Sequence, residues 1–151
     1  MKKFKIYRIC YSPGYCDMMG GGHGIYIDRD DSGKIIYTSR DREDHASPES
    51  ITTYDVPQEA LSQLEEFIQK NRVLSLAKRP ASDLFITDYS PWSISIDYEK
   101  ATFGKVRRYY LNIGEYKKYS ERDNRTINEL IRRITSLRGE KLSETKGKIE
   151  K

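Results

Sequence analysis

The stretch Ser93-Ile94-Ser95-Ile96-Asp97-Tyr98 alternates polar and apolar side chains along its whole length. Because successive side chains of a strand point to opposite faces, this alternation predicts a strand with one buried and one wet face. Gly104 marks a turn, and residues 106–113 return with alternating apolar positions, so the two segments form a predicted hairpin. A sheet with one solvated face is typical of antiparallel pairing, which decides the fold class.

The N-terminal part of the chain contains further predicted strands. Residues 3–11 alternate loosely and are rich in tyrosine and isoleucine. Residues 24–28 and 34–38 flank Arg29-Asp30-Asp31-Ser32-Gly33, a run with turn-forming residues that predicts a second hairpin. Residues 51–54 are a candidate for one more short strand.

Two segments have the apolar spacing of amphipathic helices. The first begins with Asp55 as its expected N-cap and ends at Asn71. The second begins near Glu121 or Asp123 and runs to Arg138, and Gly139 has the character of the residue that follows a helix. The two apolar stripes consist of Ala60, Leu61, Leu64, Phe67 and Ile68, and of Ile127, Leu130, Ile131, Ile134 and Leu137.

These elements predict a single α+β domain over residues 1–139. We expect an antiparallel sheet of four to six strands, built from two hairpins, with both helices on one face and the order β-ββ-α-ββ-α. The composition, 36% hydrophobic and 33% charged, is polar but globular. Residues 140–151 contain only two sizeable apolar side chains, so we expect a charged, disordered tail.

Charge and cysteine content limit the class of protein. Residues 1–99 carry 12 basic and 16 acidic side chains, whereas residues 100–151 carry 15 basic and 7 acidic ones. A basic C-terminal third is compatible with an acidic partner, and it is equally typical of a solvated helix face. No apolar run approaches the roughly 18 residues of a membrane span, and no secretion signal is visible. We therefore expect a cytoplasmic protein with no membrane partner, in which Cys10 and Cys16 are thiols; outside the cytoplasm the two could form a disulfide.

Reactive side chains are concentrated in Tyr15-Cys16-Asp17-Met18-Met19-Gly20-Gly21-Gly22-His23-Gly24. The donor spacing lacks the regularity of a metal motif, so no metal or other cofactor is expected. Cys16 could act as a nucleophile with His23 or His45 as its base, which leaves a thiol- or metal-dependent enzyme as an alternative. The three glycines could form an anion-binding nest or simply allow close backbone packing.

A second cluster is Thr87-Asp88-Tyr89-Ser90-Pro91-Trp92. Pro91 restricts its own backbone and that of Ser90, so the loop is expected to be stiff. Asp88, Tyr89 and Trp92 together could bind a small polar ligand or a peptide. The structural alternative is that Trp92 closes one end of the core.

Basic and aromatic residues alternate in the C-terminal third, as they do in modules that stack single-stranded nucleic acid on a sheet. One face of the strand is expected to be buried, which leaves only part of this set for a ligand. No motif of the RNA-binding sheet modules is present. The residues concerned are Lys105, Arg107, Arg108, Tyr109, Tyr110, Lys117, Lys118 and Tyr119.

The segments Tyr15–His23 and Phe85–Ile94 resemble signature blocks of an uncharacterised bacterial family. The layout over residues 4–138 is similar to that of small α+β domains of unknown function. The resemblance implies no activity, cofactor or catalytic residue.

The function predicted from these features is a non-enzymatic binding module for a protein or a small polar ligand. Its expected ligand-binding residues are Cys16, Asp17, His23, Asp88, Tyr89 and Trp92, because both loops precede strands and could lie at one edge of the sheet. The two alternatives are the enzyme using Cys16 and His23, and a single-stranded nucleic-acid binder using the basic, tyrosine-rich third.

Overall fold

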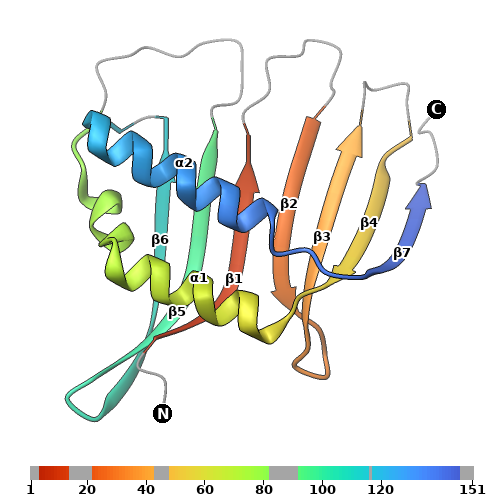
Figure 1. Cartoon of the computed structure of the whole chain (residues 1–151), viewed down its shortest axis with the longest axis horizontal. Coiled ribbons are helices and arrows are strands. Elements are labelled where there is room, and N and C mark those ends of the chain that lie inside the picture. The colour runs from red at the N-terminus through yellow and green to blue at the C-terminus, as the bar shows by residue number, and fades with distance from the viewer. Residues whose placement is uncertain (1–3, 14–21, 43–47, 82–91, 116, 147–151) are drawn as a thin grey trace.

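The structure is a computed structural model that describes residues 4–13, 22–42, 48–81, 92–115 and 117–146 (Figure 1). The described elements are, in chain order, β1 (Phe4–Ser12), β2 (Gly22–Arg29), β3 (Ile35–Arg42), β4 (Ser50–Asp55), α1 (Gln58–Lys70), the 3-10 helix η1 (Val73–Lys78), β5 (Ser93–Thr102), β6 (Lys105–Gly114), α2 (Glu121–Thr135) and β7 (Lys141–Lys146).

The strands form one seven-stranded antiparallel sheet in the order β6-β5-β1-β2-β3-β4-β7. The α+β class and the antiparallel sheet are confirmed, but the expected four to six strands are too few. Both predicted hairpins are present, with Arg29 opposite Ile35 at the end of one and Thr102 opposite Lys105 at the end of the other. The short candidate strand near residue 51 is β4, which pairs with β3.

The predicted disordered tail is wrong for residues 141–146, which form the edge strand β7. This strand pairs with β4, and the hydroxyls of Thr53 and Ser143 lie 2.5 Å apart across the two strands. Leu142 stays about half exposed, at 48%. An edge strand held by its backbone ladder and wet on both faces needs few apolar side chains, so its composition resembles that of a disordered segment.

The core lies between one face of the sheet and the two helices, which Figure 1 shows in front of the strands. Alternate strand residues such as Ile9, Ile27 and Ile96 are fully or almost fully buried. Leu64 of α1 and Leu130 of α2 contribute buried side chains to the same cluster. The opposite face of the sheet carries the intervening polar side chains, as the alternation in the sequence predicts.

α1 begins later than its N-cap signal suggests, whereas the start of α2 at Glu121 confirms the prediction. Asp55 is the last residue of β4 rather than an N-cap, and Pro57 occupies the cap position of α1 without a side-chain hydrogen bond. Ser120 caps α2: its Oγ accepts a bond from the Asp123 backbone N–H, and the Asp123 carboxylate accepts one from the Ser120 N–H. This reciprocal capping box ties down the first turn of α2.

Gly139 does not directly follow a helix, because α2 ends at Thr135 with Ser136 as its C-cap. Its N–H donates to the Asp55 carbonyl oxygen at 2.6 Å. A Cβ at position 139 would lie 3.0 Å from that oxygen and 3.1 Å from Pro57 Cδ. The glycine is therefore needed for the close approach of the chain to the end of β4, which leads β7 into the sheet.

Candidate functional site

The two loops singled out in the sequence leave the sheet at one end. Ser12, the last residue of β1, lies opposite Ser93, the first residue of β5. The backbone of His23 pairs with Asp41 in the adjacent hairpin. Cys16, Asp17, Asp88 and Tyr89 lie outside the described residues. That these side chains share a ligand with His23 and Trp92 stays a prediction.

Trp92 is partly buried and packs against the core. Its ring centroid lies 6.1 Å from that of Tyr119, and its carbonyl oxygen accepts a hydrogen bond from Glu115 at 3.2 Å. Tyr119 in turn accepts a bond from the Gly114 N–H through its hydroxyl oxygen, and burial raises the pKa of this tyrosine. These contacts give Trp92 a structural role at the end of the sheet, as the alternative interpretation of its loop predicts.

The open face of the sheet holds several cations that already have acidic partners. Arg108 binds Asp97 through two hydrogen bonds of 3.0 and 3.2 Å, and it also stacks on Tyr7, 4.3 Å from the ring centroid. Arg8 pairs with Asp28 at 3.1 Å. Because Arg8 and Arg108 are balanced on the face itself, these two residues add little net positive field for a nucleic-acid backbone.

The tyrosines of β6 are also engaged. Tyr109 stacks on Tyr98 with ring centroids 5.4 Å apart on the core side, and the Tyr110 hydroxyl donates to Ser95 at 3.0 Å. The expected burial of one face of this strand is confirmed for Leu111 and Ile113, but Tyr109 on the same face is 38% exposed. The stacking of Tyr109 on Tyr98 and the hydrogen bond of Tyr110 to Ser95 weaken the case for a stacking platform.

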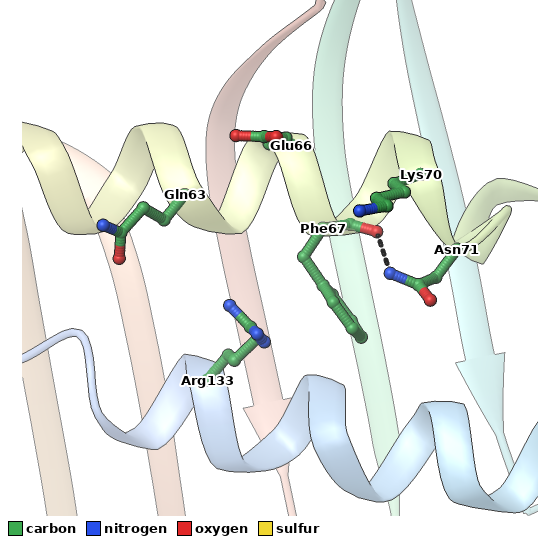
Figure 2. Close-up of a pocket in the computed structure, with 6 residues that line it drawn as sticks. All are labelled: Gln63, Glu66, Phe67, Lys70, Asn71 and Arg133. Carbon is green, nitrogen blue, oxygen red and sulfur yellow. Dashed lines mark hydrogen bonds between the residues drawn. The ribbon is translucent and has the colours of Figure 1, made fainter.

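A groove on the helical side of the molecule runs between α1 and α2. At one end, a pocket of about 550 Å³ is lined by Gln63, Glu66, Phe67, Lys70, Asn71 and Arg133. Figure 2 shows Phe67 and Arg133 pointing toward each other from the two helices. The Arg133 guanidinium lies 4.6 Å from the Phe67 ring centroid, and the Asn71 side chain donates to the Phe67 carbonyl oxygen at 3.0 Å.

The groove continues through two further pockets of about 320 and 340 Å³. All three pockets share Asn71, and the last two share Arg122 and Thr126. We call the combined surface the interhelical groove. Its remaining lining residues are Arg72, Ser75, Leu76, Arg79, Asp123, Arg125 and Glu129.

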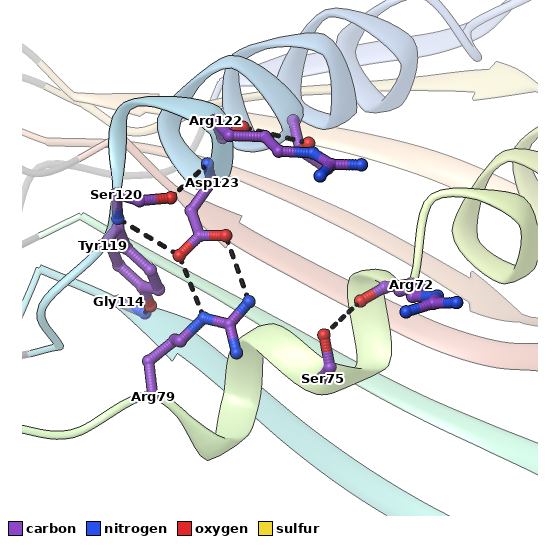
Figure 3. A network of polar contacts seen from close by, with 9 residues as sticks. Arg72, Ser75, Arg79, Gly114, Tyr119, Ser120, Arg122 and Asp123 are labelled. Carbon is purple, nitrogen blue, oxygen red and sulfur yellow. Dashed lines mark hydrogen bonds and ion pairs between the residues drawn. The ribbon is translucent and has the colours of Figure 1, made fainter.

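A salt bridge closes the far end of the interhelical groove, where η1 meets α2 (Figure 3). Arg79 Nε and Nη2 donate to the two carboxylate oxygens of Asp123 at 2.9 and 3.1 Å. These hydrogen bonds hold the pKa of Asp123 below its ordinary value. Asp123 is therefore an anion already neutralised by Arg79, and at the same time part of the α2 capping box.

Glu129 is neutralised in the same way. Arg132 and Arg133 both donate to its carboxylate, and these bonds lower the pKa of Glu129 to about 2. Two of the three acidic groups that line the interhelical groove, Asp123 and Glu129, thus have arginine partners.

Four cations along the interhelical groove have no such partner. Among the described residues, Lys70, Arg72, Arg122 and Arg125 form no ion pair, and all four are exposed. Arg122 and Arg125 follow one another on α2 at helical spacing, which puts both on the same side of that helix. The groove therefore combines an excess of free positive charge with a partly buried aromatic ring.

The enzymatic alternative invokes a metal ion or a thiol. No group of three or more His, Cys, Asp or Glu side chains among the described residues could hold a metal ion. Cys10 is a free thiol on the open face of the sheet, and burial raises its pKa, which disfavours the thiolate. Within the described part of the chain, no helix is long and apolar enough to cross a membrane.

Comparison with protein-family models, curated proteins and solved structures finds no match for this chain. The resemblance to an uncharacterised bacterial family stays a prediction. The fold is α+β, and the interhelical groove is the described surface from which we infer a function.

The sequence contains a partial signal for the interhelical groove. Arg122 and Arg125 belong to the basic C-terminal third, and they lie on the polar side of a predicted helix. The contribution of Arg72 had no such signal. Arg72 follows α1 with a left-handed backbone, φ 54°, and only the path of η1 brings it beside α2.

Proposed function

We propose that this chain is a non-enzymatic binding module and that an acidic segment of a partner protein binds in the interhelical groove. The observation that carries the proposal is the set of unpaired cations Lys70, Arg72, Arg122 and Arg125 beside the aromatic ring of Phe67. This surface is distinct from the two loops that the sequence favoured, and it consists of described residues alone.

The shape of the interhelical groove supports a peptide rather than a single small ion. Three consecutive pockets share lining residues, so one extended ligand could occupy them in series. Carboxylates of the ligand would face the arginines, and an apolar side chain would reach Phe67. Arginine suits this role because its planar group can bind a carboxylate through two hydrogen bonds.

The cytoplasm is the compartment we propose for this activity. A reducing environment keeps the thiol of Cys10 free, as it is in the structure.

Fluorescence anisotropy with a labelled peptide of alternating glutamate and leucine tests the proposal. The expected result is saturable binding to the full chain that weakens steeply as sodium chloride is added, because salt screens exposed charges. A matched peptide of alternating glutamine and leucine should not bind. Equal binding of both peptides would contradict the proposal.

Two variants with equal loss of charge place the site. Arg122→Gln with Arg125→Gln removes two cations of the interhelical groove, and Lys100→Gln with Lys105→Gln removes two from the β5–β6 hairpin. We expect the first variant to weaken binding at least about tenfold. The second should leave the affinity for the acidic peptide unchanged. If both variants lost affinity equally, general charge rather than the groove would explain binding.

A further inference from the structure

The end of the β5–β6 hairpin, residues 100–107, extends past its neighbours in the sheet. The described pairing of β1 with β5 ends at Phe4 opposite Lys100, and beyond that point the described residues of the hairpin pair only with each other. Figure 1 shows its turn at the lower left, well away from both helices. We call these residues the hairpin tip. It has three features that a purely structural turn does not need.

The first feature is the turn residue Phe103. The loop consists of Phe103 and Gly104 between the paired residues Thr102 and Lys105, and φ is +52° and +77° at its two positions. Asn-Gly is the preferred sequence for such a turn, because bulky side chains rarely adopt a left-handed backbone. Phe103 is also fully exposed. An aromatic residue is thus held in a strained conformation where it makes no core contact.

The second feature is a pair of like charges. Lys100 lies directly opposite Arg107 across the two strands, an arrangement that destabilises a hairpin. Lys105 adds a third cation close by. Among the described residues none of the three forms an ion pair, and the sequence contains no acidic residue from position 100 to 114.

The third feature is the separation of apolar and basic side chains. Ala101 pairs with Val106, and this pair points to one side of the ribbon because Lys100 and Arg107 form the next pair along. Val106 is 55% exposed. The hairpin tip is therefore an amphipathic ribbon with an apolar side, a cationic side and an aromatic ring at its end.

We infer that the hairpin tip is a peripheral contact for an anionic lipid surface, with Phe103 and Val106 entering the interface and Lys100, Lys105 and Arg107 facing the headgroups. All three features become favourable at such a surface. Anionic headgroups reduce the repulsion between the like charges, and the exposed Phe103 ring and the apolar side of the ribbon leave water. The inference does not depend on the interhelical groove. It concerns binding to a membrane surface rather than insertion across a membrane.

Nucleic acid is the other polyanion that a basic hairpin could bind, but the neighbouring residues favour lipid. The aromatic rings further along β6 are held by Tyr98 and Ser95, and Arg108 is held by Asp97. Phe103 is then the aromatic residue of the hairpin that is wholly free, whereas single strands are bound by several stacked rings in series. An apolar side chain such as Val106 offers nothing to a phosphate backbone.

The test is co-sedimentation of the full chain with vesicles. Vesicles of phosphatidylcholine mixed with phosphatidylserine should bind the protein, vesicles of phosphatidylcholine alone should not, and added sodium chloride should release it. The variant Lys100→Gln with Lys105→Gln should weaken the partition coefficient about fivefold for each charge removed. Arg122→Gln with Arg125→Gln, which removes two cations elsewhere, should leave it unchanged.

Phe103→Asn separates the aromatic contribution from the fold. Asparagine tolerates the left-handed backbone, so this variant should melt at the same or a higher temperature than the wild type. Its vesicle partition coefficient should nevertheless fall about tenfold or more, since the ring no longer leaves water. Wild-type partitioning by this variant would overturn the proposed insertion.

A spectroscopic readout gives the depth of the contact. In Phe103→Trp, tryptophan emission should shift to the blue on anionic vesicles and be quenched by brominated lipid, beyond the response of Trp92 in the wild type. The inference would be overturned by no binding to anionic vesicles at low salt, or by equal binding to neutral vesicles. It would also be overturned if the protein bound an oligothymidylate through Phe103 and did not bind vesicles.

Discussion

The Glu65 carboxylate of α1 accepts a hydrogen bond from the backbone N–H of Ile6 in β1, at 2.8 Å and across 59 positions of sequence. Glu65 is 5% exposed, which makes it the charged residue buried in the core of the described chain. The Ile6 carbonyl oxygen also accepts a hydrogen bond from a side chain, that of Arg29, whose Nη2 lies 3.3 Å away. Side chains thus complete the hydrogen bonding of β1 where its pairing is irregular, between Ile6 and Arg8.

Replacing Glu65 by leucine should destabilise the fold by about 1–3 kcal/mol, because the buried N–H of Ile6 loses its acceptor. Glu65→Gln retains a side-chain oxygen and should lose less. Urea denaturation followed by circular dichroism measures both variants. The control is Glu66→Leu, one position away and exposed. Equal unfolding midpoints for the three variants would contradict a structural role for this hydrogen bond.

Gly139→Ala should destabilise the protein by about 1–3 kcal/mol, because the new methyl group would meet Asp55 O at 3.0 Å and Pro57 at 3.1 Å. The damage should be local to the β4–β7 edge. Hydrogen exchange followed by NMR is the appropriate measurement, and the amides of residues 141–146 should lose protection first. Glu140→Ala, an exposed change next in sequence, is the control. Protection of β7 identical to that of the wild type would refute this account of Gly139.

Asp123 provides a prediction for acid stability. Hydrogen bonds from Arg79 keep its folded-state pKa below the ordinary value of 3.8. A carboxyl group with a lowered folded pKa stabilises the fold fully above its unfolded pKa, and the contribution disappears as pH falls through the folded value. Asp123→Asn should therefore lose stability at neutral pH, and the difference from the wild type should shrink below about pH 4. Urea melts at a series of pH values measure this; a difference that grows in acid would contradict it.

Cys10 should react slowly with iodoacetamide. Burial raises the pKa of its thiol, and only the thiolate is the nucleophile. In a Cys16→Ser variant, Cys10 is the remaining thiol. Its rate of reaction with iodoacetamide near neutral pH should be below that of glutathione in the folded protein and should rise to the glutathione rate when the protein is unfolded. A folded rate above that of glutathione would identify an activated thiol and revive the enzymatic alternative.

The alternation of residues 93–98 was enough to predict an antiparallel sheet with one wet face, because burial follows the period of the strand. Helix existence was equally predictable from the apolar stripes, and so were the end of α1 at Asn71 and the start of α2 at Glu121, whereas the other two helix ends were not. Asp55 has the chemistry of an N-cap and belongs to a strand, because pairing with Ile36 of β3 extends β4 to that position. Such competition between a local signal and a long-range pairing is not visible along the chain.

The interhelical groove shows the same division. The positive charge of Arg122 and Arg125 can be predicted from the sequence. That these two residues lie near Phe67 and Arg72 depends on how α2 packs beside α1 and η1. The strand β7 was missed for the opposite reason. Its residues lack an apolar face, and the backbone ladder to β4 supplies what the side chains do not.

The measurement that bears most directly on the proposed function is a ¹⁵N-¹H NMR titration of the full chain with the glutamate–leucine peptide. Peptide binding in the interhelical groove should give chemical-shift changes that saturate together and are confined to residues 63–79 and 121–133, with the amides near Phe67 and Arg122 most affected. Arg72→Asn, which keeps a residue tolerant of the left-handed backbone while removing the charge, should weaken the titration severalfold. Shifts that instead cluster on β5 and β6, or no shifts at low salt, would contradict the assignment of the groove as the binding site.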